Sequence, residues 1–223
     1  MKLAIYDFDG TYVNIQTVPV IFKVWDKMKL NKHLSKKYFR TIKWWYLMHK
    51  IKLGWSKEVF RKNAMALTLD LLNHLDSDKR QQFNNAFYQY CQPLISPDLK
   101  KQLLLDKQQG YVCVLLSGNF NELLLPFKQE GFDDVIGSET EKNGQRLNSQ
   151  TIDIIINQKK IESVKKRFDG ESITHTKAYA DSGYDLQLLL YVDEPYAYKP
   201  DKQLQKDAEK YGIPSYNQDS PNV

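Results

Sequence analysis

The chain has 223 residues, of which 42% are hydrophobic and 13% aromatic, so it is long enough for one large domain or a domain with a smaller insert. Its net charge is only +5, and it contains no run of about 18 apolar residues that would predict a membrane span. The first residues lack a secretory pattern, and the two cysteines, Cys91 and Cys113, lie in apolar segments without metal-ligand spacing. We therefore expect a cytoplasmic protein with reduced thiols.

The first predicted element is a short buried strand that ends in two aspartates. The apolar run over residues 3–6 leads to Asp7 and Asp9, and Gly10 and Thr11 follow. Side chains at the carboxyl end of such a strand line the ligand-binding edge of an open α/β sheet. Two nearby carboxylates need a neutralising charge, and Mg²⁺ prefers oxygen ligands. Without further residues, an ordinary Asp-Gly turn explains the pattern equally well.

The next segment, residues 14–92, is predicted to be wholly helical. Apolar residues recur at helical spacing, and Gly54 and Ser56 mark a helix stop and a helix start. The predicted helices cover about 18–30, 35–52, 56–72 and 78–91. Because this block follows the first strand directly, we interpret it as an inserted cap above the carboxyl edge of the sheet.

Positive charge and aromatic residues are concentrated in part of this helical block. Residues 23–62 contain 13 Lys or Arg but only two acidic residues, Asp26 and Glu58. The same segment contains Trp25, Trp44, Trp45, Tyr46 and Trp55. Such a segment can bind nucleic acid, an anionic membrane surface or an anionic small substrate. A solvated helical face over a tryptophan-containing core is the simpler interpretation, and we favour it.

From residue 93 onward, predicted helices alternate with predicted strands. The helices cover about 97–109, 121–130, 158–168, 186–191 and 200–211, and the strands cover 111–116, 134–137, 177–180 and 196–198, with a possible hairpin around Asn143-Gly144. This alternation predicts an α/β fold with a Rossmann-like parallel sheet, helices on both faces and an inserted all-helical cap. The predicted core is 1–13 and 93–223, and the predicted cap is 14–92.

Polar residues follow three of the predicted strands. Besides Asp7 and Asp9, Ser117 follows the second strand, and Asp181 and Asp185 follow the strand at 177–180. The carboxyl ends of parallel strands meet at one edge, so these side chains can converge. A lysine at the start of the helix at 158–168 can reach the same edge, and either Lys159 or Lys160 qualifies.

This combination suits phosphoryl transfer. Asp7 can attack phosphorus and form an aspartyl phosphate, while Asp9 gives a proton to the leaving oxygen and later takes one from water. Mg²⁺ held by Asp7, Asp181 and a backbone carbonyl would neutralise charge on the transferring group. Ser117, one lysine, and backbone N–H groups near Gly118 and Asn119 can bind the remaining phosphate oxygens.

Four motifs in this order are similar to those of the haloacid dehalogenase-like (HAD) superfamily of phosphatases and phosphotransferases. They are Asp7-Phe8-Asp9-Gly10-Thr11, Leu115-Leu116-Ser117-Gly118, a helix-opening lysine, and Ala180-Asp181-Ser182-Gly183-Tyr184-Asp185. The chain most resembles the branch that includes phosphoserine phosphatase, which has a helical cap after the first strand. We prefer Lys160 for the third motif because Ile161 and Val164 follow it with the family's apolar spacing.

The resemblance implies a set of site residues and a cofactor. Asp7 and Asp9 would be catalytic, Ser117, Gly118 and Lys160 would bind phosphate, and Mg²⁺ would lie at Asp7, Asp9 and Asp181 with support from Ser182 and Asp185. Two positions depart from the family pattern. Ala180 replaces a common glycine, and no Asp or Glu occurs between Asp9 and Asp26, where phosphoserine phosphatases often have an acidic residue for the substrate ammonium.

The resulting functional hypothesis is a Mg²⁺-dependent phosphatase that hydrolyses a small phosphorylated metabolite through an aspartyl phosphate. One alternative is a phosphotransferase that passes the phosphoryl group to an acceptor other than water. A second is a binding protein that uses the basic aromatic cap on an anionic membrane or nucleic acid. With the first hypothesis we expect no nucleic-acid partner and no membrane span.

Overall fold

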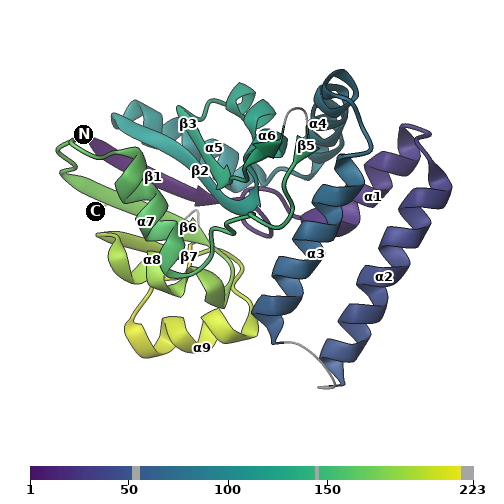
Figure 1. Ribbon diagram of the computed structural model, residues 1–223. Helices are drawn as coiled ribbons and strands as arrows, with labels where there is room; N and C mark the ends of the chain where they lie inside the picture. The colour runs from purple at the N-terminus through teal and green to yellow at the C-terminus, as the bar shows by residue number, and fades with distance from the viewer. Residues whose placement is uncertain (52–55, 144–145, 217–223) are drawn as a thin grey trace. The chain divides into compact units, whose positions relative to one another are not determined.

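Figure 1 shows a computed structural model of the protein, which describes residues 1–51, 56–143 and 146–216. Several positions used in the sequence-based predictions lie outside the described residues: the end of the predicted helix 35–52, Gly54, Trp55, Gly144 and the last part of the predicted core, 217–223. Within the described part of the chain, no helix is long and apolar enough to cross a membrane.

The chain forms two compact units, which we call the sheet unit and the helical unit. The sheet unit comprises Met1–Ile15, Cys91–Ser138 and the chain from Ile155 onward. The helical unit comprises Gln16–Tyr90 and Glu139–Ile154.

The sheet unit is built on a five-stranded parallel sheet in the order β3-β2-β1-β6-β7 (Figure 1). These strands span, in that order, Asp134–Ser138, Tyr111–Phe120, Lys2–Asp7, His175–Ala180 and Glu194–Ala197. The apolar run of β1 is fully buried between β2 and β6, as expected for a central parallel strand. The predicted Rossmann-like α/β fold class is confirmed.

Helices lie between the strands of this sheet along the chain, and one more follows the last strand, β7. They are α5 (Pro97–Gln108), α6 (Asn121–Leu124), α7 (Gln158–Arg167), α8 (Leu186–Tyr191) and α9 (Lys202–Tyr211), with short 3₁₀ segments η1 (Gln92–Leu94), η2 (Leu125–Glu130) and η3 (Gly183–Asp185). Local sequence sets several helix ends. Ser96 caps α5 by accepting the Leu99 N–H, and Asp201 caps α9 by accepting the N–H groups of Gln203 and Leu204.

Residues of β1 alternate between the two faces of the sheet. Leu3 and Ile5 join an apolar cluster with residues of α7, α8 and α9. Tyr6 points to the other face, where its hydroxyl donates a 2.6 Å hydrogen bond to the buried Asp106 of α5. Because side chains of a strand alternate with a period of two, Asp7 shares the face of Leu3 and Ile5 and lies on the α7 side.

The helical unit contains α1 (Thr17–Lys27), α2 (Lys32–Lys50), α3 (Lys57–Leu72) and most of α4 (Ser77–Cys91). Asn31 and Ser56 cap α2 and α3 with their side chains. Trp25 is fully buried, and its indole N–H donates to the Asn31 carbonyl oxygen at 3.0 Å. The buried apolar residues of this unit include Val20, Ile21, Val24, Met65, Leu69, Phe83 and Phe87.

One segment differs in its attachment from the sequence-based division. Residues 139–154 fall in the predicted core segment 93–223, but in the structure they belong to the helical unit. They include a short antiparallel pair, β4 (Lys142–Asn143) and β5 (Arg146–Leu147). The Asn73 amide at the end of α3 donates to the Leu147 carbonyl at 2.7 Å and accepts the Leu147 N–H at 2.9 Å. This two-bond clasp explains the attachment.

Candidate active site

The carboxylate of Asp7 is the centre of the candidate site. It lies at the carboxyl end of β1 and is almost fully buried. Lys160 Nζ, from the first turn of α7, lies 2.5 Å from Asp7 Oδ1. The hydroxyl of Thr11 lies 3.2 Å from Asp7 Oδ2 and 3.2 Å from an oxygen of Asp181, so its proton can be donated to either carboxylate.

The turn after β1 brings Thr11 back beside Asp7. Backbone hydrogen bonds from Tyr12 N to Asp7 O, 3.1 Å, and from Gly10 N to Val13 O, 2.9 Å, close this turn. Gly10 has φ +77°, in the left-handed region that favours glycine. A Cβ atom at Gly10 would also collide with the carboxylate of Asp181. The conformation and the close approach therefore both require glycine at this position.

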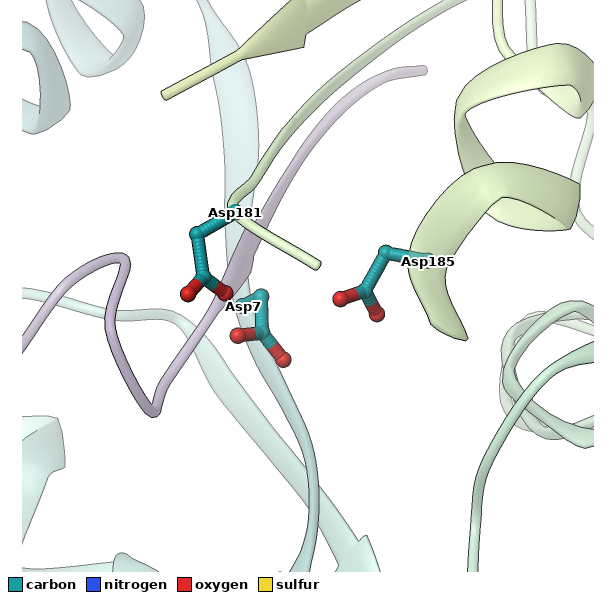
Figure 2. A group of neighbouring side chains, drawn as sticks. All are labelled: Asp7, Asp181 and Asp185. Carbon is teal, nitrogen blue, oxygen red and sulfur yellow. The ribbon is translucent and has the colours of Figure 1, made fainter. Parts of the chain in front are cut away.

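The second group of acidic side chains follows β6. Figure 2 shows the carboxylates of Asp7, Asp181 and Asp185 pointing toward one another, and one oxygen of each lies within 4.8 Å of the others. Lys160 Nζ forms an ion pair with Asp185 as well as with Asp7. The Ser182 hydroxyl donates to the other oxygen of Asp185 at 2.6 Å, which fixes that carboxylate.

Burial and like-charge repulsion shift the titration of these carboxylates. Burial, with added repulsion from Asp185, raises the pKa of Asp7 to about 7, although Lys160 opposes the shift. Burial and the charges of Asp7 and Asp185 raise the pKa of Asp181 to about 8. Burial alone would lower the pKa of Lys160, but Asp185 and Asp7 outweigh it and raise that pKa above its ordinary value. Lys160 thus forms ion pairs with Asp7 and Asp185, and its charge also acts on Asp181.

This donor set fits a hard divalent cation. Three carboxylates supply the oxygen ligands that Mg²⁺ prefers, and their crowding leaves negative charge that a cation would neutralise. A divalent ion would favour the ionised forms of Asp7 and Asp181, whose pKa values are raised without it.

A second cluster forms where β2 ends. The pairing of β2 with β3 shifts register between Leu116 and Phe120, so Ser117 and Asn119 lie at an irregular point of the sheet. The Asn119 side-chain amide donates to Asp9 Oδ2 at 2.9 Å and to Ser117 Oγ at 3.1 Å. Ser117 Oγ also accepts the Asn119 backbone N–H at 3.2 Å. Asn119 therefore links the ends of β1 and β2.

The two candidate lysines have different environments. Lys160 is buried and contacts Asp7 and Asp185, whereas Lys159 is exposed. Ile161 and Val164 belong to the same apolar cluster as Leu3 and Ile5, which turns the Lys160 side of α7 toward the sheet. The spacing that favours Lys160 in the sequence corresponds to this buried face.

Sequence reasoning missed two contributions to the site. It treats Thr11 only as part of a motif, yet the Thr11 hydroxyl lies between Asp7 and Asp181. It considers Asn119 only for its backbone N–H, yet the side chain joins Asp9 to Ser117. A hydroxyl two residues after Asp9 is a usable signal for Thr11. For Asn119 the sequence carries no comparable signal, because 110 residues separate it from Asp9.

The fold and the site define an α/β protein with an acidic centre at the carboxyl edge of a parallel sheet. The haloacid dehalogenase-like hydrolase family matches residues 4–190, most of the chain. The chain belongs to this family, and the membership predicted from its four motifs is confirmed. No curated protein sequence matches the chain.

Several solved structures share the fold. A protein of unknown function from Bordetella pertussis Tohama I is 16% identical, with a TM-score of 0.82 over 97% of this chain and 98% of that one. A phosphoserine phosphohydrolase-like protein from Francisella tularensis subsp. tularensis SCHU S4 is 17% identical, with a TM-score of 0.58 over 98% of this chain and 95% of that one. A phosphoserine phosphatase in its apo form is also 17% identical, with a TM-score of 0.59 over 98% of this chain and 94% of that one. At these identities the likeness concerns the fold alone.

Proposed function

We propose that the protein is a Mg²⁺-dependent phosphatase that hydrolyses a small phosphomonoester through an aspartyl phosphate on Asp7. The observation that supports this most strongly is the buried Asp7 carboxylate, held by Lys160 at 2.5 Å beside Asp181 and Asp185. Membership in a hydrolase family and a fold shared with proteins named phosphoserine phosphatases support the same conclusion.

In the proposed first step, an oxygen of Asp7 attacks phosphorus and the bond from phosphorus to the leaving oxygen breaks. Asp9 acts as the general acid that protonates this oxygen. In the second step Asp9, now a carboxylate, takes a proton from water as the water attacks the aspartyl phosphate. Phosphate is released and Asp7 is regenerated. The amide of Asn119 donates to Asp9 at 2.9 Å and would orient it for both proton transfers.

Ser117, Gly118 and Lys160 would bind the phosphoryl oxygens. Ser117 Oγ accepts two hydrogen bonds from Asn119, so its own proton can be donated to a phosphate oxygen. Lys160 is held in the site by Asp7 and Asp185, and Asp185 is in turn fixed by Ser182. This support keeps the ammonium in place before substrate binds, which reduces reorganisation during the reaction.

Asp7, Asp181 and the backbone carbonyl of Asp9 would hold Mg²⁺. Asp185, with Ser182, would support the site, and its carboxylate is close enough to Asp7 and Asp181 to act as a further ligand. When bound, the cation supplies neutralising charge for the transferring phosphoryl group and its nucleophile.

The proposal includes the division of the chain into a catalytic core and a cap. Residues 1–13 and 93–223 would form the catalytic core, with 139–154 assigned to the helical unit, and residues 14–92 would form a substrate-selecting cap. We also propose a cytoplasmic location, because Cys91 and Cys113 are free buried thiols, as is usual in a reducing compartment.

The proposal is tested by phosphate release from p-nitrophenyl phosphate and a panel of small phosphate esters, including phosphoserine, with and without Mg²⁺. We expect Mg²⁺-dependent turnover in the wild type and none above background in Asp7→Asn. Product analysis with added alcohols separates hydrolysis from transfer. Turnover that is unchanged in Asp7→Asn, or a wild type inactive on every ester, contradicts the proposal.

A further inference from the structure

The outward face of α2 carries an exposed apolar stripe that the proposed chemistry does not use. Trp44, Leu47 and Ile51 are 59%, 56% and 52% exposed. With Arg40 they are spaced four, three and four residues apart, which places them along one side of the helix, with Ile51 at its C-cap. We call these four residues the α2 stripe. Exposed large apolar side chains that occur singly are ordinary, but a contiguous set on one helix indicates an interaction surface.

The opposite side of α2 provides its packing within the helical unit. Ser35 and Ile42, seven residues apart, are buried, and α2 lies beside α3 in Figure 1. Ile42 is two residues from both Arg40 and Trp44, and a two-residue step turns a helix by about 200°. The α2 stripe therefore faces away from the buried side of its own helix.

Cations border the α2 stripe. The helix contains no Asp or Glu but six lysine or arginine residues, all of them exposed: Lys32, Lys36, Lys37, Arg40, Lys43 and Lys50. Lys36, Lys43 and Lys50 recur every seven residues and line one flank of the stripe. Their long aliphatic stems allow the ammonium groups to reach a charged layer while neighbouring side chains enter an apolar one.

We propose that the α2 stripe, with Lys36, Lys37, Lys43 and Lys50, docks the protein on an anionic lipid surface. An exposed helix with a tryptophan and aliphatic residues between lysines matches the two parts of such a surface, its acyl boundary and its negative headgroups. A second copy of the chain is a poorer occupant, because it would bring the same cations face to face. RNA would attract the cations, but it offers no apolar layer to Leu47 and Ile51. The proposal is independent of the proposed phosphatase activity.

Co-sedimentation of the full chain with lipid vesicles tests this proposal. One set of vesicles is pure phosphatidylcholine, and the other contains about a third phosphatidylglycerol, which supplies the negative surface potential. We expect binding to the anionic vesicles, weaker binding as salt is raised, and little binding to the neutral ones. Failure of the wild type to bind anionic vesicles at low salt overturns the proposal without reference to any variant.

Paired variants separate the apolar contribution from the charge contribution. Trp44→Ser with Leu47→Ser removes two side chains that would insert into the lipid. It should lower the partition coefficient about a hundredfold, the effect expected for losing the burial of two large apolar side chains. Lys36→Gln with Lys43→Gln removes two surface charges and should lower the partition coefficient about thirtyfold and flatten its salt dependence. Thermal melting confirms that each variant is folded.

Matched controls lie in the sheet unit. Leu104 on α5 is 55% exposed, so Leu104→Ser removes an equally exposed leucine. Lys202→Gln with Lys206→Gln on α9 removes two exposed lysines. We expect both controls to bind like the wild type. Three results overturn the proposal: folded α2 variants that bind like the wild type, a dimer that Trp44→Ser dissociates, or RNA binding without vesicle binding.

Discussion

Gly10 is the residue whose replacement most directly links backbone geometry to the acidic centre. It has a positive φ of +77°, and a Cβ at this position would meet the carboxylate of Asp181. An alanine would therefore have two separate costs. The left-handed conformation costs a non-glycine residue about 1–2 kcal/mol, and the new methyl group would displace Asp181 from Asp7 and Thr11.

We predict that Gly10→Ala lowers the free energy of unfolding by more than this conformational cost. It should also weaken Mg²⁺ binding and turnover at least tenfold, because the displaced Asp181 carboxylate no longer lies in its place in the site. Gly110→Ala is the matched control, because Gly110 has φ +79°. Apart from Gly110 and its two chain neighbours, the described residues place no atom within 4 Å of the position that an added Cβ would occupy. Gly110→Ala should lower the free energy of unfolding but leave Mg²⁺ binding and turnover unchanged. Chemical denaturation and Mg²⁺ titration distinguish the two, and equal behaviour of both variants would contradict the role assigned to Asp181.

In the proposed mechanism Asn119 positions Asp9, since the Asn119 amide donates to both Asp9 and Ser117. We predict that Asn119→Ala lowers kcat about tenfold or more, the scale of a misplaced acid–base group, and shifts the limb of the pH–rate profile that belongs to Asp9. Asn14→Ala, whose side chain is exposed, serves as the control. A loss of stability with unchanged kcat in the folded variant would assign Asn119 a structural role only.

The local sequence pattern predicted where helices and strands lie better than it predicted which distant segments pack together. Continuous apolar runs identified β1 and β2, and capping residues such as Ser96 and Ser56 located helix starts. The predicted end of β2 is too early, because Ser117 to Phe120 lack the apolar pattern of a strand yet remain in it. The attachment of 139–154 was not predictable, because it depends on Asn73 and Leu147, which are 74 residues apart.

The candidate site also divides into residues that a local sequence pattern predicts and contacts that no such pattern predicts. Asp7, Asp181 and Asp185 could be placed together from strand ends alone, since parallel strands share an edge. Lys160 could be preferred to Lys159 because the apolar residues one and four positions after it define the buried face of α7. The side-chain link from Asn119 to Asp9 depends on an irregular strand end, and no periodic pattern encodes that irregularity.

The clasp between α3 and β5 can be tested by a single substitution. Asn73→Ala leaves the N–H and carbonyl of Leu147 without these partners, which should cost about 1–3 kcal/mol if they stay buried. We predict faster amide hydrogen exchange across 139–154 and little change in the sheet unit. Asn85→Ala on the exposed side of α4 is the control. Unchanged exchange at Leu147 in Asn73→Ala would show that other contacts hold this segment.

The crowded carboxylates link the stability of the entire protein to pH and, through the proposed metal site, to Mg²⁺. Asp7 and Asp181 have pKa values of about 7 and about 8, against 3.8 for ordinary aspartate. At a pH between the ordinary aspartate pKa and these raised pKa values, the folded state binds more protons than the unfolded state. The free energy of unfolding without metal therefore falls as pH rises toward 8. At the proposed metal site Mg²⁺ would bind the ionised carboxylates, so its stabilising effect would grow over the same pH range.

We therefore predict that Mg²⁺ raises Tm more at about pH 9 than at about pH 6, by about 2–4 °C for each kcal/mol of binding free energy. Scanning calorimetry with chelator or saturating Mg²⁺ measures this difference. Asp181→Asn should reduce both the Mg²⁺ effect and the pH dependence, whereas Asp207→Asn on α9 should change neither. A Tm that does not respond to Mg²⁺ at either pH would contradict the proposed metal site.

The aspartyl phosphate that we propose on Asp7 can be tested for directly. In Asp9→Asn, p-nitrophenyl phosphate can still react, because its leaving group needs no acid, while hydrolysis lacks its base. Acid-quenched samples analysed by mass spectrometry should show one added phosphoryl group, mapped to the peptide that contains Asp7. Asp7→Asn should show none. Phosphate release without this adduct, and with Asp7→Asn still active, would contradict the proposed mechanism.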